Sequence, residues 1–458
     1  MSDKFLWKGR IEKEFDREAF SFSSSLNIDR NLFEEDILNT LAHSKTLNKI
    51  GIISEEEIKK IEYGLLIIKD KIERGEINFD EEKYEDIHSF IEFNLKEIIG
   101  ETAEKIHAGR SRNDQIATDE RLWAKKACDI LINLIIKFQK ILAYKAEEHI
   151  YTIMPCYTHL QRAQVISLGY HLLSYAEGME RDKKRFLFVK EESDDCPLGC
   201  GAIAGSTIDL DREFSAKYLG FSSISANGMD GVSDRDFFLD FLNACSICSL
   251  RLSRLCEDLF LWSSKEWNFA RLPDEFVTGY SLMPQKKNPD IIELIRAKSS
   301  RTVSNYLNLS MILKALPMAY CRDLQEDKAS VFEAYENLIS SLNLLCKIID
   351  KMEFNVERFE KEILDSFMWA TDLADYLVKK KIPFRKAHSI VASLVSYIEK
   401  ENVKISDLNL NDLKKFSDCF EEDALNIIFN LKSFELKKTY GSPNPVFVKK
   451  RIDYFKEI

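Results

Sequence analysis

One stretch of the chain, Gly279–Asp290, combines a glycine, two prolines and two neighbouring lysines. Pro284 and Pro289 exclude a helix interior or a central strand, so this part of the segment must be a loop. Asn288 is suited to cap a helix that begins at Pro289, so the loop should lead directly into that helix. A loop with two lysines and an amide can grip and enclose an anionic substrate. The alternative is a basic surface loop with an ordinary helix cap.

A second polar cluster, His107–Gln115, lies just before a long predicted helix. Arg110 and Arg112 flank Ser111, and guanidinium groups bind carboxylates through two parallel hydrogen bonds. Ser111 and Asn113 can add hydrogen bonds that orient the bound group. The cluster therefore indicates a carboxylate site, and a helix cap with surface ion pairs is the alternative.

A third cluster, Tyr157–Gln164, follows Pro155 and is expected at another junction between a loop and a helix. His159 stands there among hydroxyl, amide and guanidinium groups, a composition that suits proton transfer or orientation near an anion. A lone histidine more often has only a packing role, which is the alternative here.

A fourth segment, Leu316–Lys328, is rich in polar side chains. Tyr320, Gln325 and Lys328 can converge on a polar ligand from one helix end. The alternative is a charged turn between two helices of a bundle.

Asp86 and His88, with Glu92 nearby, form a weaker fifth signal, because acidic residues beside a histidine are common on helix faces. All five clusters are polar, mostly basic and expected where loops meet helices. Their combination on one helical scaffold indicates a shared anion-binding site.

The elements that must position these residues are long helices, because the chain contains only 16 glycines and 9 prolines. Short amphipathic helices, such as residues 55–74, are expected over 31–112, and short helices return after about residue 360. The region between them contains the longest helical runs, which are residues 114–151, 162–192, 231–266, 289–313 and 325–354.

The segment Ile130–Ile136 is apolar on more than one face, which is typical of a helix buried in a bundle and covered by other subunits. The sequence therefore predicts an all-α fold with a long central helical bundle that oligomerises. Three helical domains are expected, over residues 1–112, 113–360 and 361–458, with breaks in the last domain at 381–385 and 441–445.

The composition limits the partners and the compartment. Lys and Arg total 65 and Asp and Glu total 76, so the net charge is −11, which argues against nucleic acid or an anionic membrane as the main partner. No apolar run has the length of a signal peptide core or a membrane span, so a cytoplasmic protein is expected. The ten cysteines are scattered, and even the close pair Cys245 and Cys248 fits buried thiols better than a metal site.

The segment Gly279–Asp290 resembles the signature loop of the fumarase and aspartase superfamily, and its Gln-Lys-Lys-Asn-Pro-Asp part resembles the argininosuccinate lyase family in particular. The other four clusters fit the same family in chain order. Shorter matches support the resemblance, namely Leu6-Trp7, Gly9-Arg10, Ser25, Asp29-Arg30, Pro197–Gly199, Gly205, Asp211–Glu213, Ser233–Asp236 and, more loosely, Pro383–Arg385 and His388.

The resemblance implies β-elimination of argininosuccinate to arginine and fumarate, without a cofactor or metal. It implies a homotetramer in which each active site is assembled from three subunits. The implied catalytic groups are His159, Lys286, Glu293 and the residue that acts as base. The implied substrate-binding residues are Ser25, Asp86, Arg112, Asn113, Thr158, Asn288, Tyr320, Gln325 and Lys328.

One position departs from the family pattern, because Tyr280 stands where the family has its catalytic serine. Three interpretations follow: Ser281 takes the role after a shift of one residue, Tyr280 is itself the base, or catalysis is lost or altered. An active argininosuccinate lyase is the main hypothesis. The alternatives are a related lyase for another adduct of fumarate with an amine, and a catalytically impaired binding or structural paralogue.

Overall fold

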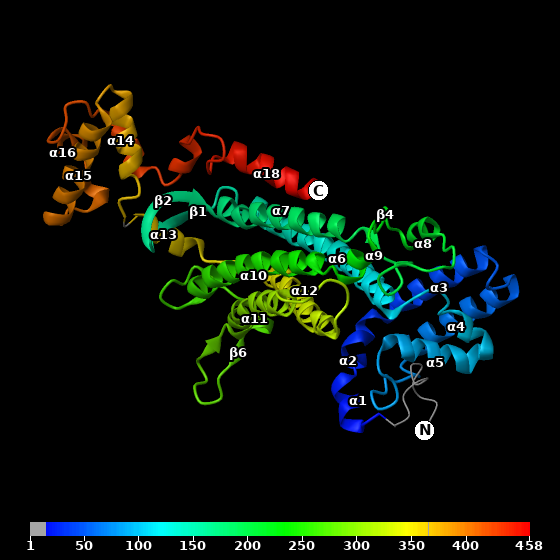
Figure 1. Ribbon diagram of the computed structural model, residues 1–458. Helices are drawn as coiled ribbons and strands as arrows, with labels where there is room; N and C mark the ends of the chain where they lie inside the picture. The colour runs from blue at the N-terminus through cyan, green and yellow to red at the C-terminus, as the bar shows by residue number, and fades with distance from the viewer. Residues whose placement is uncertain (1–14, 365) are drawn as a thin grey trace. The chain divides into compact units, whose positions relative to one another are not determined.

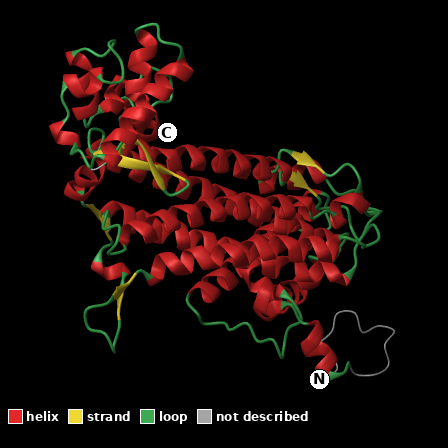
Figure 2. Cartoon of the chain, turned by 90° about the vertical axis from the view of Figure 1, so that its left-hand side faces the viewer, coloured by secondary structure: helices red, strands yellow, loops and turns green. Residues whose placement is uncertain are grey.

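The computed structural model describes residues 15–364 and 366–458, so the short matches at Leu6-Trp7 and Gly9-Arg10 lie outside the described residues. Helices make up most of this part of the chain (Figure 2). Its few strands are short and form two-stranded pairs. The predicted all-α fold is confirmed. None of the helices in the described residues is both long enough and apolar enough to span a membrane.

Five long helices dominate the described residues, and each overlaps one of the predicted runs. The run 231–266 is broken at residues 234 and 235, and the run 325–354 ends in a short strand at 353–354. Residues 162–167 were expected to be helical but form a strand, which pairs antiparallel with the strand before it. The long helices are α6 (Arg112–Glu148), α7 (Leu168–Glu192), α10 (Asp236–Ser263), α11 (Asp290–Leu313) and α12 (Asp327–Lys351) (Figure 1).

The chain divides into two compact units, and each long helix supplies residues to both. Unit 1 consists of residues 1–132, 184–247 and 300–338. Unit 2 consists of residues 133–183, 248–299 and 339–458.

Unit 1 contains a hydrophobic core built from the helices of the N-terminal region, with Leu65, Phe90 and Leu95 among its fully buried residues. The predicted helix 55–74 is confirmed. Ser54 caps its N-terminus through a reciprocal capping box. The N-terminal helices are α1 (Arg17–Ser23), α2 (Leu26–Asp29), η2 (Arg30–Leu32), α3 (Phe33–Lys49), α4 (Glu55–Glu73), α5 (Ile87–Ile99) and η3 (Gly100–Lys105). Later elements are β3 (Asp195–Cys196), α8 (Arg212–Leu219), β4 (Ser223–Ile224), α9 (Gly228–Ser233) and η5 (Arg322–Glu326).

Unit 2 contains the largest strand pair, β1 (Ile153–Thr158) with β2 (Gln161–Ser167). The smaller pairs join β5 (Ala270–Arg271) to β8 (Glu353–Phe354) and β6 (Thr278–Gly279) to β7 (Lys287–Asn288). Its shorter helices are η4 (Asp274–Phe276), α13 (Val356–Leu364), α14 (Ala370–Lys379), α15 (Phe384–Lys400), η6 (Ile405–Asp407), α16 (Leu410–Lys414), α17 (Glu422–Phe429), η7 (Ser433–Leu436) and α18 (Pro445–Glu457).

The expected breaks in the last hundred residues coincide with the ends of helices. α14 ends at Lys379 and α15 begins at Phe384, and α18 begins at Pro445 with Asn444 as its cap. The last helix is fixed to the long helices of unit 2, because Arg451 forms an ion pair with Glu177 of α7.

All ten cysteines lie in the described residues, and all are free thiols. Cys245 and Cys248 are fully buried in α10. This placement agrees with the expected buried thiols.

The junction from β2 to α7 fixes the base of the hairpin formed by β1 and β2. The backbone N–H of Leu168 donates to the Thr152 carbonyl, and that of Gly169 donates to the His149 carbonyl. A Cβ on Gly169 would lie only 2.5 Å from the Ala146 carbonyl oxygen at the end of α6. Glycine is therefore required here for close approach of two backbones.

We predict that Gly169→Ala lowers the free energy of unfolding by roughly 1–3 kcal/mol, because a backbone carbonyl cannot move aside as a side chain can. Ser174→Ala, at an exposed position of the same helix, should change it by less than about 0.5 kcal/mol. Denaturant unfolding of both variants measures the difference. Equal stabilities for the two variants would contradict the close approach.

Candidate active site

A pocket of about 440 Å³ in unit 1 gathers seven of the predicted substrate-binding residues. They are Ser25, Asp86, Arg112, Asn113, Tyr320, Gln325 and Lys328. The pocket is also lined by Phe15, Asp29, Glu85, His88, Ile116 and Arg322. Four segments that are far apart in the sequence therefore contribute to one polar cavity.

Most of these residues lie at the ends of helices. Asp86 caps α5, accepting a hydrogen bond from the Ser89 backbone N–H at 2.7 Å. Arg112 and Asn113 occupy the first turn of α6, whose cap is Ser111, since its hydroxyl accepts from the Asn113 N–H. Side chains in the first turn of a helix are held firmly by that helix, so the cavity is largely preformed.

Arg112 and Asp86 form an ion pair within the pocket. Burial acts to raise the pKa of Asp86, but Arg112 and the Ser89 backbone N–H outweigh it and lower the pKa to about 2. Asp86 is therefore ionised at neutral pH and holds the guanidinium in place.

A second set of contacts holds Gln325 in η5, just before helix α12 begins. Its amide donates to the Ser23 carbonyl at 3.1 Å, and Arg322 donates to the same carbonyl at 2.8 Å. Arg322 also pairs with Glu85 at 2.8 Å. These bonds join η5 to the segment before α2, so the two sides of the pocket are tied together.

Lys328 is 2% exposed and is surrounded by carboxyl groups. Its ammonium lies 3.0 Å from Asp327, 3.4 Å from Glu120 and 3.7 Å from Asp29. Arg235 contacts two of the same groups, at 2.5 Å from Asp327 and 2.7 Å from Glu120. We call these five residues the buried charge cluster.

The buried charge cluster holds three carboxyl groups and only two cations. Burial and the neighbouring Asp327 raise the pKa of Glu120 to about 8, although Arg235 and Lys328 act in the opposite direction. Burial alone would lower the pKa of Lys328, but Asp327, Asp29 and Glu120 raise it instead. The raised pKa of Glu120 favours its neutral form, and the raised pKa of Lys328 favours its charged form, so the excess of negative charge in the cluster is reduced.

Three further buried side chains, Asp36, His88 and Asp119, bring their ligand atoms within 4.8 Å of one another. Their ligand atoms could hold a cation, but these side chains already form hydrogen bonds. His88 lies 2.7 Å from Asp36, and Asn39 donates to Asp119 at 2.8 Å. Burial and the nearby Asp36 raise the pKa of Asp119 well above its usual value. The group fits a hydrogen-bonded support behind the pocket better than a metal site.

The predicted residues Thr158 and His159 belong to unit 2, at the tip of the β1–β2 hairpin, where both are exposed. The sequence predicted a junction between a loop and a helix here, and that prediction was wrong. Strand β2 pairs with β1 along most of the segment, so the helix begins only at Leu168.

The signature loop, Gly279–Asp290, also belongs to unit 2. Its two ends pair as β6 and β7, a ladder of two residues per strand that the sequence did not predict, and helix α11 begins at Asp290 instead of Pro289. Tyr280, Ser281 and Lys286 are exposed in the loop, and Asn288 and Glu293 are half-buried at its helical end.

Within the loop, the Lys286 ammonium lies over the Tyr280 ring, 5.1 Å from its centroid. The expected pairing of His159 with Glu293 is not seen, since no hydrogen bond or ion pair joins them in the described part of the chain. The structure thus gathers seven predicted residues in one cavity of unit 1 and places the other seven on two segments of unit 2.

Two family models match the chain, one described as "Lyase" over residues 9–304 and one described as "Argininosuccinate lyase C-terminal" over residues 367–434. Proteins named argininosuccinate lyase from Thermoanaerobacter sp. (strain X514) and Bacillus velezensis (strain DSM 23117 / BGSC 10A6 / LMG 26770 / FZB42) are each 45% identical to it. The alignments cover 96% of this chain and 99% and 95% of those proteins. The chain belongs to the argininosuccinate lyase family.

A solved structure agrees with this membership. An EDDS lyase variant with bound fumarate has a TM-score of 0.84 against this chain at 26% identity, covering 94% of this chain and 86% of that one. The argininosuccinate lyase family consists of carbon–nitrogen lyases, so the predicted family and enzyme class are both confirmed.

Three residues that support the pocket of this argininosuccinate lyase family member were not predicted as site residues from the sequence. They are Glu120 and Asp327, which contact Lys328, and Arg235, which contacts Glu120 and Asp327. One signal could have found Glu120, because it follows Asn113 by seven residues and so lies two turns along the same face of α6. Arg235 lies within the short family match Ser233–Asp236, to which the sequence assigned no role.

We predict that Glu120→Gln makes this lyase relatively more stable as the pH rises. The folded pKa of about 8 lies above the ordinary value near 4.3, so the stability that the Glu120 proton contributes is lost as pH rises toward 8. Glutamine keeps a donor without titrating. The melting temperature of the variant relative to the native chain should rise by roughly 2–4 °C between about pH 5 and pH 8.5. A difference that stays constant over this range would contradict the raised pKa of Glu120.

Proposed function

We propose that the chain cleaves argininosuccinate by β-elimination and releases arginine and fumarate. The observation that carries the proposal is the cavity of unit 1, which is lined by seven of the nine residues that the family pattern assigns to substrate binding. Relatives named argininosuccinate lyase, 45% identical over nearly the whole chain, support the choice of substrate.

The chemical problem is to remove a weakly acidic proton beside a carboxylate, which places extra negative charge on that carboxylate. Fixed cations and hydrogen-bond donors stabilise such charge best when they are in place before the reaction. We assign this task to Lys286 and Asn288 at the signature loop. His159, supported by Glu293, assists proton transfer near the departing amine or orients the substrate.

Substrate binding follows the same pattern. Arg112, Asn113, Thr158 and Gln325, with Tyr320 and Lys328, are assigned to the succinyl carboxylates, and the arginine portion lies near Ser25 and Asp86. The buried carboxyl groups around Lys328 raise its pKa, which favours the charged ammonium. Asp86 is ionised but paired with Arg112, so it acts on the substrate together with that guanidinium.

The base is assigned to Ser281 or Tyr280. The Lys286 ammonium lies over the face of the Tyr280 ring, an attraction worth about 0.5–1 kcal/mol at an exposed site. This contact gives the tyrosine a role in holding Lys286 and supports Ser281 as the base.

We predict that Ser281→Ala lowers the rate of fumarate release by at least roughly 100-fold, whereas Tyr280→Phe retains most of it because the ring remains. Tyr280→Ser restores the family residue and is the matched control. The measurement is steady-state fumarate release from argininosuccinate. Loss of activity in Tyr280→Phe alone would assign the base to the phenol, and an inert native chain that gains activity as Tyr280→Ser would overturn the proposed function.

We further propose a homotetramer in which each active site is assembled from residues of three subunits. Large apolar side chains exposed on the long helices support it, because such side chains become buried when helices of several subunits pack into one bundle. Examples are Ile130 on α6, Phe188 on α7, Leu250 on α10, and Leu307 and Met311 on α11.

If the site is shared between subunits, dissociated but folded monomers are inactive. We predict that activity per chain falls in parallel with the tetramer fraction on dilution, as measured by sedimentation and fumarate release on the same samples. Equal activity in a folded monomer would contradict the shared site.

The division into domains over residues 1–112, 113–360 and 361–458 is kept as a proposal, together with a cytoplasmic location. Separate hydrophobic cores near the two ends of the chain support the first and last domains, one around Phe90 and one around Leu377 and Phe420. The return of α18 to α7 means that the last domain also contributes to the central bundle.

A further inference from the structure

The turn that carries His159 has an unfavourable backbone conformation. His159 and Leu160 are its two central residues, and their φ angles are +55° and +56°. Turns of this kind usually contain asparagine and glycine, and a residue with a side chain costs roughly 1–2 kcal/mol in this region. Such a turn persists only where its surroundings hold it.

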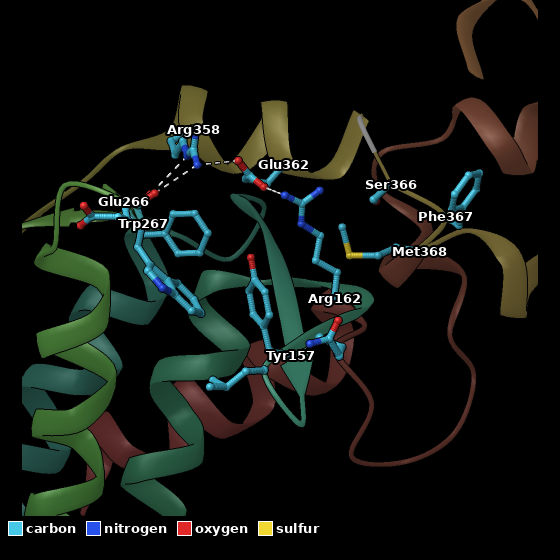
Figure 3. Close-up of a pocket in the computed structure, with 12 residues that line it drawn as sticks. Tyr157, Arg162, Glu266, Trp267, Arg358, Glu362, Ser366, Phe367 and Met368 are labelled. Carbon is cyan, nitrogen blue, oxygen red and sulfur yellow. Dashed lines mark hydrogen bonds and ion pairs between the residues drawn. The ribbon is translucent and has the colours of Figure 1, made fainter. Parts of the chain in front are cut away.

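A chain of charged contacts provides that support (Figure 3). Arg162, on strand β2 just after the turn, forms an ion pair with one carboxylate oxygen of Glu362 on helix α13. The other oxygen of Glu362 lies 2.7 Å from Arg358, one turn earlier on the same helix. Glu362 therefore joins two guanidinium groups from different elements.

Arg358 continues the chain to a third element. It donates to the backbone carbonyls of Trp267 at 3.2 Å and Glu266 at 3.3 Å, in the segment after α10. The Trp267 ring in turn packs against the Tyr157 ring of β1, with 4.8 Å between centroids. The hairpin is thus tied to α13 through Arg162 and to the end of α10 through Tyr157.

These residues line a pocket of about 550 Å³ in unit 2, and the Glu362 side chain is only 9% exposed. Ile153 and Val165 of the hairpin pack with Phe434 and with Ile363, the residue after Glu362, in a small hydrophobic cluster. Removing one partner from a nearly buried charged network costs more than removing an exposed ion pair. Loss of Glu362 would leave two like charges facing each other beside the hairpin.

We propose that Glu362 is a positioning residue for the reaction, which acts through Arg162 to hold the β1–β2 turn and so places His159. The proposal rests on the role assigned to His159 in the proposed function. Helix α13 then has a second task beyond connecting the long helices to the C-terminal helices.

The test compares Glu362→Gln, which keeps the shape and removes the charge, with the native chain in steady-state fumarate release. We expect kcat to fall roughly 10–100-fold, the size of effect that a displacement of about 1 Å produces, while KM changes less than about twofold. Asp182→Asn is the matched control, because it neutralises another buried carboxylate that pairs with an arginine, Arg251 at 2.6 Å. It should lower thermal stability but leave kcat unchanged below its melting temperature.

Two further measurements separate positioning from a general loss of stability. In the Arg162→Gln background, Glu362→Gln should cause no additional loss of kcat, because the path through Arg162 is already broken. The NMR signal of the His159 ring, assigned with His159→Gln, should shift in Glu362→Gln but not in Asp182→Asn. If Glu362→Gln does not fold, Arg162→Gln alone breaks the same ion pair from the hairpin side. It should then lower kcat and shift the His159 signal in the same way.

The outcomes distinguish this inference from the proposed function. If His159→Gln leaves fumarate release intact, the role of His159 is wrong and the positioning role falls with it. If His159→Gln abolishes activity while Glu362→Gln keeps the native kcat and an unshifted His159 signal, only the positioning role of Glu362 is overturned. Additive losses in the double variant would also overturn it, since they would show that Glu362 acts without Arg162.

Discussion

The burial of three carboxyl groups with two cations in unit 1 constrains everything around the pocket. An unpaired charge in such a place would cost several kcal/mol, so Asp29, Glu120, Asp327, Lys328 and Arg235 must stay within contact of one another. They come from four separate segments of the chain. The same contacts that neutralise the cluster therefore also fix the distances between the segments that line the pocket.

The predicted catalytic residues of the signature loop, which belongs to unit 2, lie in a different kind of environment. Lys286 and Tyr280 contact each other in an exposed loop that is closed at its base by two residue pairs. A loop with few contacts can change conformation at low cost, whereas the buried groups of unit 1 cannot. Rigid binding groups and an adaptable loop with basic side chains suit a reaction that must enclose its substrate and then release two products.

Much of the fold was predictable because apolar periodicity and scarce glycine and proline indicate long helices directly. The hairpin was missed because its turn residues, His159 and Leu160, are not typical turn formers, and residues after them alternate too little to indicate a strand. The pocket residues were found from their resemblance to a family pattern. Glu120 was missed because a charged residue inside a helix usually lies on a solvated face. Arg235 lies in the short connection between α9 and α10, and only tertiary packing shows that both residues are buried.

Five helices pass through both units, namely α6, α7, α10, α11 and α12. Each unit is made of three separate pieces of sequence, and every boundary between the pieces falls inside a helix. A truncated gene product could not contain one unit alone without interrupting several helices.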